Sequence, residues 1–173
     1  MNKNITLLLI GISLLACNFL FPQTQRSTPQ PSDFQDPQPT GFTIVRLHPK
    51  DGDLQTLLAS EAQKAFTLGR EPVVEFDATW CPPCKAIDKA IKEENALMLN
   101  AYAETYIIKL DVDEWGWGDS KLHDFQFNAI PVYFKLNVEG EQTGEVIDGG
   151  AWGEDIPENI APVMDKFFHG PPK

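Results

Sequence analysis

The pattern of apolar and polar positions predicts that a folded unit begins near residue 42. Residues 42–47 (FTIVRL) alternate as expected for a strand with one buried face. A helix is predicted next, with Asp53 at its N-cap and Gly69 at its end. Its inward face is expected to hold four apolar residues spaced four apart: Leu54, Leu58, Ala62 and Phe66. Residues 72–76 (PVVEF) are mostly apolar, which is typical of a strand buried on both sides.

The middle of the unit continues this alternation of strands and helices. One helix is predicted from about Pro82, with its inward face formed by Ile87, Ile91 and either Leu97 or Met98. Residues 105–112 (TYIIKLDV) predict a third strand. Residues 121–127 predict a short helix.

The last part of the chain predicts two strands and a helix. Residues 132–136 and 143–147 form a hairpin pattern around a Glu-Gly turn. A helical stripe follows, which comprises Ile160, Val163, Met164, Phe167 and Phe168. We expect this helix to begin near Asn159, because Pro162 fits best in a first turn. The whole order predicts an α/β fold with a central mixed sheet and helices on both faces.

Composition narrows the possible functions. The chain has 173 residues, of which 42% are hydrophobic, and this suits one domain with additional tails. Its net charge of −11 and the lack of a Lys/Arg-rich run make nucleic acid an unexpected partner. Only three cysteines are present, Cys17, Cys81 and Cys84, so a scaffold with several disulfides is excluded.

The first residues have the features of a secretion signal. Residues 1–4 are polar and include a lysine, residues 5–16 (ITLLLIGISLLA) are apolar, and Cys17 follows directly. The ending LLAC resembles the bacterial lipobox, which implies a signal peptide over residues 1–16 and an acylated Cys17. An uncleaved membrane anchor and a plain secretion signal remain alternatives. All three place the domain outside the cytosol, and the lipoprotein interpretation places it on the periplasmic side of a bacterial membrane.

A tether separates this signal from the domain. Residues 18–41 contain five prolines among Gln, Ser, Thr and Asp residues, without a helical or strand period. Such a segment is semi-extended, with ~3 Å per residue and a total reach of several tens of Å. We therefore expect an acylated cysteine and tether over residues 17–41, and a domain over residues 42–173.

Residues 77–88 (DATWCPPCKAID) place two cysteines at a predicted junction between a strand and a helix. Cys81 falls at the helix start, where unpaired amides and the positive end of the helix dipole stabilise a thiolate. Pro82 and Pro83 are tolerated there, because amides of the first turn have no partner within the helix. Cys84 is expected to lie deeper and less exposed, where it is suited to attack a mixed disulfide.

Residues 42–168 resemble a thioredoxin-fold domain. Residues 80–85 (WCPPCK) are similar to the WCxPCK active site of that family. Glu75, six residues before the first cysteine, matches its buried acid, and Lys109 matches a lysine of the next strand that packs near the acid. The Ile-Pro pair at 130–131 matches the cis-proline loop that faces the disulfide.

The resemblance implies a thiol-disulfide oxidoreductase whose only redox group is its own cysteine pair, with no cofactor. Cys81 would be the nucleophile and Cys84 the resolving cysteine. Glu75 would accept a proton from Cys84, with a pKa raised by burial, and Lys109 would modulate Glu75. Its partners would be proteins with cysteines or disulfides and an upstream thiol reductant or oxidant.

The resemblance also suggests how substrates bind and in which direction electrons flow. The backbone beside the Ile-Pro bond can pair with an extended substrate segment. The expected substrate-binding residues are Trp80, Pro82, Pro83, Ile130 and Pro131. The buried acid is glutamate where the family usually has aspartate. Glutamate is found in extracytoplasmic members similar to cytochrome c maturation reductases, and this favours a reductase, as does the absence of histidine between the cysteines.

Other interpretations of these residues remain open. A zinc site would need two further ligands, and neither Cys17 nor the three histidines have a suitable spacing, so no metal site is expected. Lys109 could be a solvated lysine, and Pro131 an ordinary trans proline. The domain could also be a binding module that holds a partner through the sheet and residues 115–118 (WGWG), with a permanently closed disulfide. Core packing is the more common role of such tryptophans. Reduction of insulin disulfides would distinguish that module from an enzyme.

Overall fold

The computed structural model describes residues 41–117, 122 and 124–170. The predicted signal peptide, the lipidation site Cys17 and nearly all of the predicted tether lie outside these residues. The predictions about them are therefore not tested by the structure.

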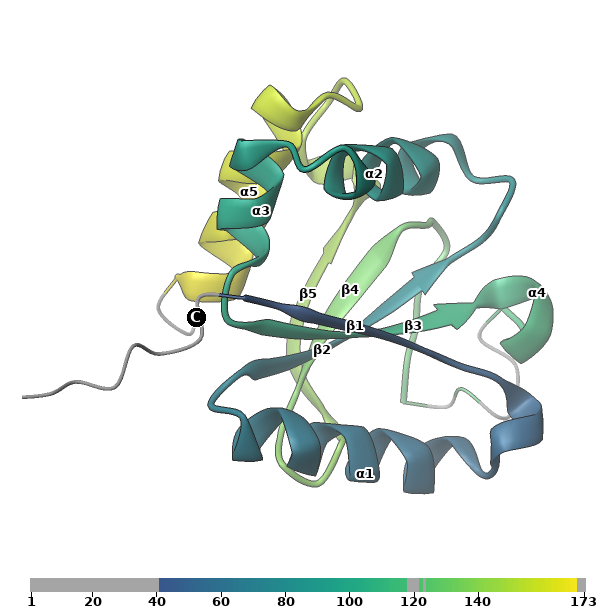
Figure 1. The fold of residues 1–173 in the computed structure, drawn as a ribbon. Helices are drawn as coiled ribbons and strands as arrows, with labels where there is room; N and C mark the ends of the chain where they lie inside the picture. Colours follow the sequence, from purple (N-terminus) through teal and green to yellow (C-terminus); the bar gives the residue numbers. More distant parts are fainter. Residues whose placement is uncertain (1–40, 118–121, 123, 171–173) are drawn as a thin grey trace, which may run out of the picture. The chain divides into compact units, whose positions relative to one another are not determined.

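A five-stranded mixed sheet forms the centre of the domain, with the order β1-β3-β2-β4-β5 (Figure 1). The first three strands in this order are parallel, whereas β4 is antiparallel to β2 and β5 is antiparallel to β4. The strands are β1 (Thr43–Leu47), β2 (Glu71–Asp77), β3 (Thr105–Asp111), β4 (Val132–Leu136) and β5 (Gln142–Asp148). The predicted strands and mixed sheet are thus confirmed.

Helices cover both faces of this sheet. They are α1 (Leu54–Thr67), α2 (Pro82–Lys92), α3 (Ala96–Tyr102), α4 (Val112–Trp115) and α5 (Pro157–His169). Figure 1 shows α1 on one side of the sheet, and α2, α3 and α5 on the other. Two short 3-10 turns, η1 (Pro49–Asp51) and η2 (Gly149–Ala151), follow β1 and β5. The predicted α/β fold with helices on both faces is confirmed.

The central strand β2 contributes to both faces, as its apolar sequence predicted. Successive side chains of a strand point to opposite sides. Val74 and Phe76 accordingly belong to the core that includes Leu58 of α1. Val73 belongs to the second core, with Met98 of α3 and other residues of α3 and α5. All of these side chains are fully buried.

The prediction of one long helix after Pro82 was wrong. Helix α2 ends at Lys92, Glu94 has a positive φ of 55°, and α3 begins at Ala96. The carboxamide oxygen of Asn95 accepts hydrogen bonds from two amides in the first turn of α3, so this asparagine starts the new helix. Met98, rather than the alternative Leu97, is the buried residue.

Further details of the predicted helices also differ. Phe66 is 49% exposed rather than inward, because each step of four residues rotates the position by about 40° around the helix. Helix α5 begins at Pro157, so Pro162 lies inside it rather than in its first turn. Leu122 and residues 124–127 are not helical, and the rest of the short helix predicted there lies outside the described residues. Helix α4 was not predicted.

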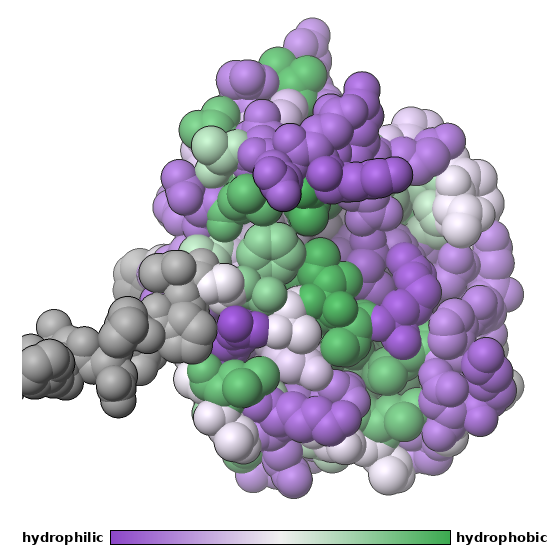
Figure 2. Space-filling model, in the orientation of Figure 1, coloured by the Kyte–Doolittle hydropathy of each residue, from purple (hydrophilic) through white to green (hydrophobic). Residues whose placement is uncertain are grey.

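Helix α2 is amphipathic and carries the predicted redox cysteines at its first turn. Its buried residues are Cys84, Ile87 and Ala90, whereas Asp88 is exposed. Figure 2 shows hydrophilic side chains over α2 and a band of apolar ones across the middle of the same face, near the edge strand β1. The fold thus directs one face of α2 against the sheet and the other to solvent.

Candidate active site

A disulfide joins Cys81 and Cys84, with an S–S distance of 2.03 Å. Cys81 is the N-cap residue of α2, and Cys84 lies in the first turn of that helix. The amide N–H of Cys84 donates to Sγ of Cys81 over 3.3 Å. Because this amide and the positive helix end point at the Cys81 sulfur, they would stabilise a thiolate there after reduction.

The two cysteines are equally buried in the oxidised protein, since each is 1% exposed. The predicted difference in depth between them is therefore not seen in this form, in which the bond holds both sulfurs in one short loop. Pro82 between them is exposed and Pro83 is half-buried.

The Ile130-Pro131 peptide bond is cis, and this loop faces the disulfide. The Cys81 sulfur lies 3.7 Å from the carbonyl oxygen of Ile130. The predicted position of the loop is confirmed, and the alternative of a trans proline is wrong. Gly149 packs tightly here, because a Cβ on it would lie 3.2 Å from Cδ of Pro131.

Glu75 and Lys109 form a buried ion pair within the sheet. They are opposite each other in the parallel pairing of β2 and β3. The ammonium of Lys109 lies 3.2 Å from Oε1 of Glu75, and both side chains are at most 5% exposed. The expected burial of Glu75 and the contact with Lys109 are confirmed, and a solvated Lys109 is excluded.

Three further charged residues join this pair, and the sequence reasoning did not identify them. The guanidinium of Arg46 donates to both carboxylate oxygens of Asp77, over 2.8 and 2.6 Å. The Lys109 ammonium lies 2.9 Å from Asp77 and 2.6 Å from Asp88 of α2. A signal for Asp77 was available, because it follows Glu75 by two residues and so points to the same face of β2.

This charge cluster gives its two β2 carboxyls different pKa values. Burial, helped by the negative charges of Asp77 and Asp88, raises the pKa of Glu75 to about 7 against the opposing effect of Lys109. Burial would by itself raise the pKa of Asp77 as well. The hydrogen bonds from Arg46 and the charge of Lys109 outweigh this effect, so the pKa of Asp77 is lowered. Glu75 can therefore exchange a proton near neutrality, while Asp77 stays ionised.

Two tyrosines line the sheet face on which Glu75 lies. Tyr133 is opposite Glu75 in the pairing of β2 and β4, and its hydroxyl is 3.1 Å from that of Tyr102. Both are completely buried, and burial raises the pKa of each hydroxyl well above its usual value. Both hydroxyls therefore stay protonated at neutral pH.

The tryptophans near the disulfide have different roles. Trp80 is 52% exposed, and its indole N–H donates to Asp113 of α4 over 2.8 Å. Trp117 is 45% exposed and stacks on Trp80, with ring centroids 6.3 Å apart and an angle of 19° between the planes. Trp115 is a core residue instead, 5% exposed, whose indole donates to the carbonyl of Leu47.

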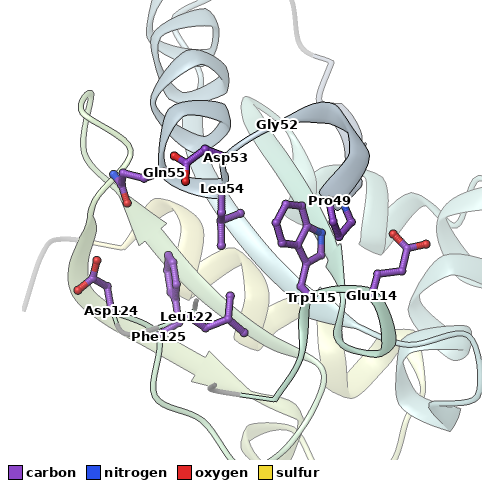
Figure 3. A pocket seen from close by; sticks show the side chains of 10 residues that line it. All are labelled: Pro49, Gly52, Asp53, Leu54, Gln55, Glu114, Trp115, Leu122, Asp124 and Phe125. Carbon is purple, nitrogen blue, oxygen red and sulfur yellow. The ribbon is translucent and has the colours of Figure 1, made fainter. Parts of the chain in front are cut away.

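A cavity of about 570 Å³ is lined by residues of η1, the start of α1 and α4, together with Leu122, Asp124 and Phe125 (Figure 3). Leu54 and Trp115 point into it, and the carboxylates of Asp53 and Asp124 stand at its rim. None of the predicted redox or substrate-binding residues lines it, although Trp115 of the alternative binding loop does. The disulfide and the charge cluster therefore form a separate centre.

Within residues 41–117, 122 and 124–170, no group of three or more His, Cys, Asp or Glu residues is placed to hold a metal ion. No helix in the same ranges has the length and apolar character needed to cross a membrane.

Comparison with known proteins adds independent information about the chain. Residues 58–162 match the family model described as Thioredoxin. The chain is 36% identical over 96 residues to a thioredoxin of Staphylococcus haemolyticus, which covers 56% of this chain and 81% of that protein. It is 34% identical over 79 residues to mitochondrial thioredoxin O of Oryza sativa, which covers 46% of this chain and 42% of that protein. The structure of Trichomonas vaginalis thioredoxin is similar over 72% of this chain and 96% of that one, with 24% identity and a TM-score of 0.44.

Proposed function

The chain belongs to the thioredoxin family, and we propose that it acts there as an extracytoplasmic protein-disulfide reductase tethered to a bacterial membrane by a lipid anchor. Family membership makes it a thiol-disulfide oxidoreductase that acts on protein disulfides. The observation that carries the proposal for the site is the Cys81–Cys84 disulfide at the start of α2, which faces the carbonyl of Ile130.

The first step begins with both cysteines reduced. The Cys81 thiolate attacks one sulfur of a partner disulfide. A bond forms between Cys81 and that sulfur, the partner's own S–S bond breaks, and its other sulfur leaves as a thiolate. The N–H of Cys84 and the N-terminal end of α2 stabilise the attacking thiolate, which is why Cys81 is assigned this role.

The second step releases the partner. Cys84 passes its proton to Glu75 and attacks the Cys81 sulfur, so that the Cys81–Cys84 bond forms and the mixed disulfide breaks. The partner's remaining sulfur leaves as a thiolate. A pKa of about 7 suits Glu75 to this task, because roughly half of the Glu75 carboxyl groups are ionised at neutral pH and can accept a proton. Two electrons reach the partner, and an upstream dithiol must reduce the pair again.

The surface around the disulfide can hold an extended substrate segment. The carbonyl of Ile130 lies beside Cys81, where it can accept a backbone hydrogen bond from such a segment in the manner of an added strand. Trp80, Pro82 and Pro83 are at least partly exposed next to the reacting sulfur. These residues, with Pro131, are the proposed substrate-binding surface.

The direction of electron flow and the location are proposed from the sequence. A glutamate at the position of the buried acid and the absence of histidine between the cysteines favour a reductase. The apolar segment of residues 5–16 and the following Cys17 favour a lipid anchor. The proline-rich residues 18–41 would give the domain room to reach partners at the membrane surface.

Insulin reduction tests the activity and a redox titration tests its direction. The full chain with dithiothreitol should reduce insulin disulfides faster than dithiothreitol alone, and Cys81→Ser should abolish the acceleration. A reduction potential near the ~−270 mV of thioredoxin would support a reductase, whereas a value near the ~−120 mV of a strong oxidant would contradict it. An inactive wild-type chain would instead support the closed binding module.

A further inference from the structure

We propose that Trp80 and Trp117 together form an aromatic shelf that binds a large apolar side chain located next to the reactive cysteine of a partner. The proposal rests on the proposed disulfide exchange and adds a substrate preference to it. Trp117 would then determine specificity, although it lies 36 residues after the first redox cysteine in the sequence.

Exposure is the first observation that supports the shelf. Trp80 and Trp117 are 52% and 45% exposed, and they stack on each other. Single exposed apolar residues are normal on protein surfaces, but two adjoining indoles form a continuous apolar surface, which is typical of an interaction site. Trp115, two residues before Trp117, shows that the fold could bury a tryptophan in this segment.

Both rings are also held in place before any partner binds. The indole N–H of Trp80 is bonded to Asp113 of α4. Trp117 packs on Phe127 with centroids 5.9 Å apart, and Phe127 packs on the fully buried Phe76 with centroids 4.6 Å apart. Because few rotamers remain to be fixed, binding an apolar group on these rings loses little conformational entropy.

The position of the shelf indicates what binds there. Trp80 directly precedes Cys81, whose sulfur also faces the Ile130 carbonyl. A partner segment paired along Ile130 would advance by roughly 3.3 Å per residue. Residues one or two positions from its cysteine would therefore come within reach of the indole rings.

Because the disulfide is buried, a partner must be held by residues around it. Cys81 and Cys84 are each only 1% exposed, so the sulfurs themselves offer little surface for binding. Contacts around them must hold the partner while the sulfurs react. The shelf supplies apolar contacts on the Trp80 side, and Ile130 supplies backbone contacts.

The test uses two disulfide peptides that differ only at the two positions after the cysteine, which are Phe in one and Ser in the other. The detergent-solubilised full chain should have a higher kcat/KM for the Phe peptide. Trp117→Ala should reduce the Phe-to-Ser ratio about three- to tenfold, the range expected for an aromatic pair, and Trp117→Phe should retain most of it. Phe66→Ala is the matched control, because it removes an equally exposed aromatic ring from α1 and should change neither rate. An equal loss for both peptides, or no change in the ratio, would overturn the shelf.

A binding measurement separates the shelf from the proposed function. The chain has four tryptophans, so four indole N–H signals are expected in a ¹H–¹⁵N spectrum. A Phe peptide with serine in place of cysteine should shift the signals of Trp80 and Trp117 and leave those of the buried Trp115 and Trp152 unchanged. This result would support the shelf even if no peptide were reduced. A failure to reduce the peptides would count against the proposed function and not against the shelf. Unchanged Trp80 and Trp117 signals would overturn the shelf while leaving disulfide reduction intact.

Discussion

The ammonium of Lys109 lies 3.2 Å from the carboxylate of Glu75 in the interior of the domain, yet the pKa of Glu75 is still raised to about 7. The reason is that Lys109 is shared. It lies even closer to Asp77, at 2.9 Å, and to Asp88, at 2.6 Å. One cation therefore does not compensate fully for the burial of Glu75, and this leaves a carboxyl that can exchange a proton at neutral pH.

Replacing Glu75 with Gln should slow the second step of disulfide exchange more than the first. Gln keeps the shape of the side chain but cannot accept the proton of Cys84. General bases contribute about 100-fold or more, so mixed disulfide should accumulate near pH 7 in rapid-mixing experiments. The deficit should shrink as the pH rises and hydroxide takes the proton. Glu71→Gln, at the other end of β2, is the control, and an unchanged rate for Glu75→Gln at pH 7 would exclude Glu75 as the base.

The same substitution should make stability less dependent on pH. The folded pKa of Glu75, about 7, is above its ordinary value of 4.5, so the folded protein binds more protons than the unfolded chain between these values. Wild-type stability from this group is therefore full below about pH 4.5 and is lost as the pH rises through 7.

Urea unfolding at pH 5 and pH 8 measures this effect. From pH 5 to pH 8 the wild type should lose the stability that protonated Glu75 provides, whereas Glu75→Gln should not. The free energy of unfolding of the variant, relative to that of the wild type, should therefore rise by up to ~3 kcal/mol between the two pH values. A difference between the two proteins that is the same at both pH values would show that Glu75 has no raised pKa in the folded state.

Removing the buried cation should be strongly destabilising. Lys109→Met would leave Glu75, Asp77 and Asp88 without the ammonium that they share, and breaking a buried ion pair on one side costs about 3–5 kcal/mol. Lys89→Met is the control, because that exposed lysine is 3.9 Å from Glu93 and such pairs contribute about 0–1 kcal/mol. Chemical denaturation should show the contrast at pH 7. Similar losses for the two variants would mean that Lys109 has no special structural role.

The two cysteines should differ in reactivity once they are reduced. Alkylation at increasing pH should label Cys81 first, with an apparent pKa below the ~8.5 of a free thiol, because the Cys84 amide and the start of α2 stabilise its thiolate. Cys84→Ser should trap mixed disulfides with partner proteins, whereas Cys81→Ser should trap none. Faster labelling of Cys84 would reverse the two assignments.

The lipid anchor is tested by Cys17→Ala. Acylation of Cys17 should make the mature chain partition into detergent, and the substitution should prevent this and leave the chain soluble or uncleaved. One lipid chain alone binds membranes only marginally, so firm attachment requires several. Mass spectrometry that finds an unmodified chain starting at Met1 would contradict the lipoprotein hypothesis.

Local sequence patterns were sufficient to predict the five strands and the junction between a strand and a helix that carries the redox cysteines. Glu75, Lys109 and the Ile-Pro pair before β4 were predicted from the resemblance to the thioredoxin family rather than from such patterns. The strand before Cys81 and the start of the helix after it, in contrast, follow from short-range patterns. These features depend on neighbours within a few residues along the chain, which is the range that hydrophobic periodicity and helix capping report.

Only the tertiary structure decided which distant side chains meet. Arg46, Asp77 and Asp88 come from β1, β2 and α2, and their distances to one another or to Lys109 depend on strand order and helix packing. The different positions of Trp115 and Trp117 have the same origin. The two side chains are identical, but Trp115 is buried beside Leu47 and Trp117 stacks on Trp80. Each of these contacts is with a segment more than thirty residues away in the sequence. Burial and pairing of this kind are properties of the packed domain, since they arise from residues that the sequence keeps far apart.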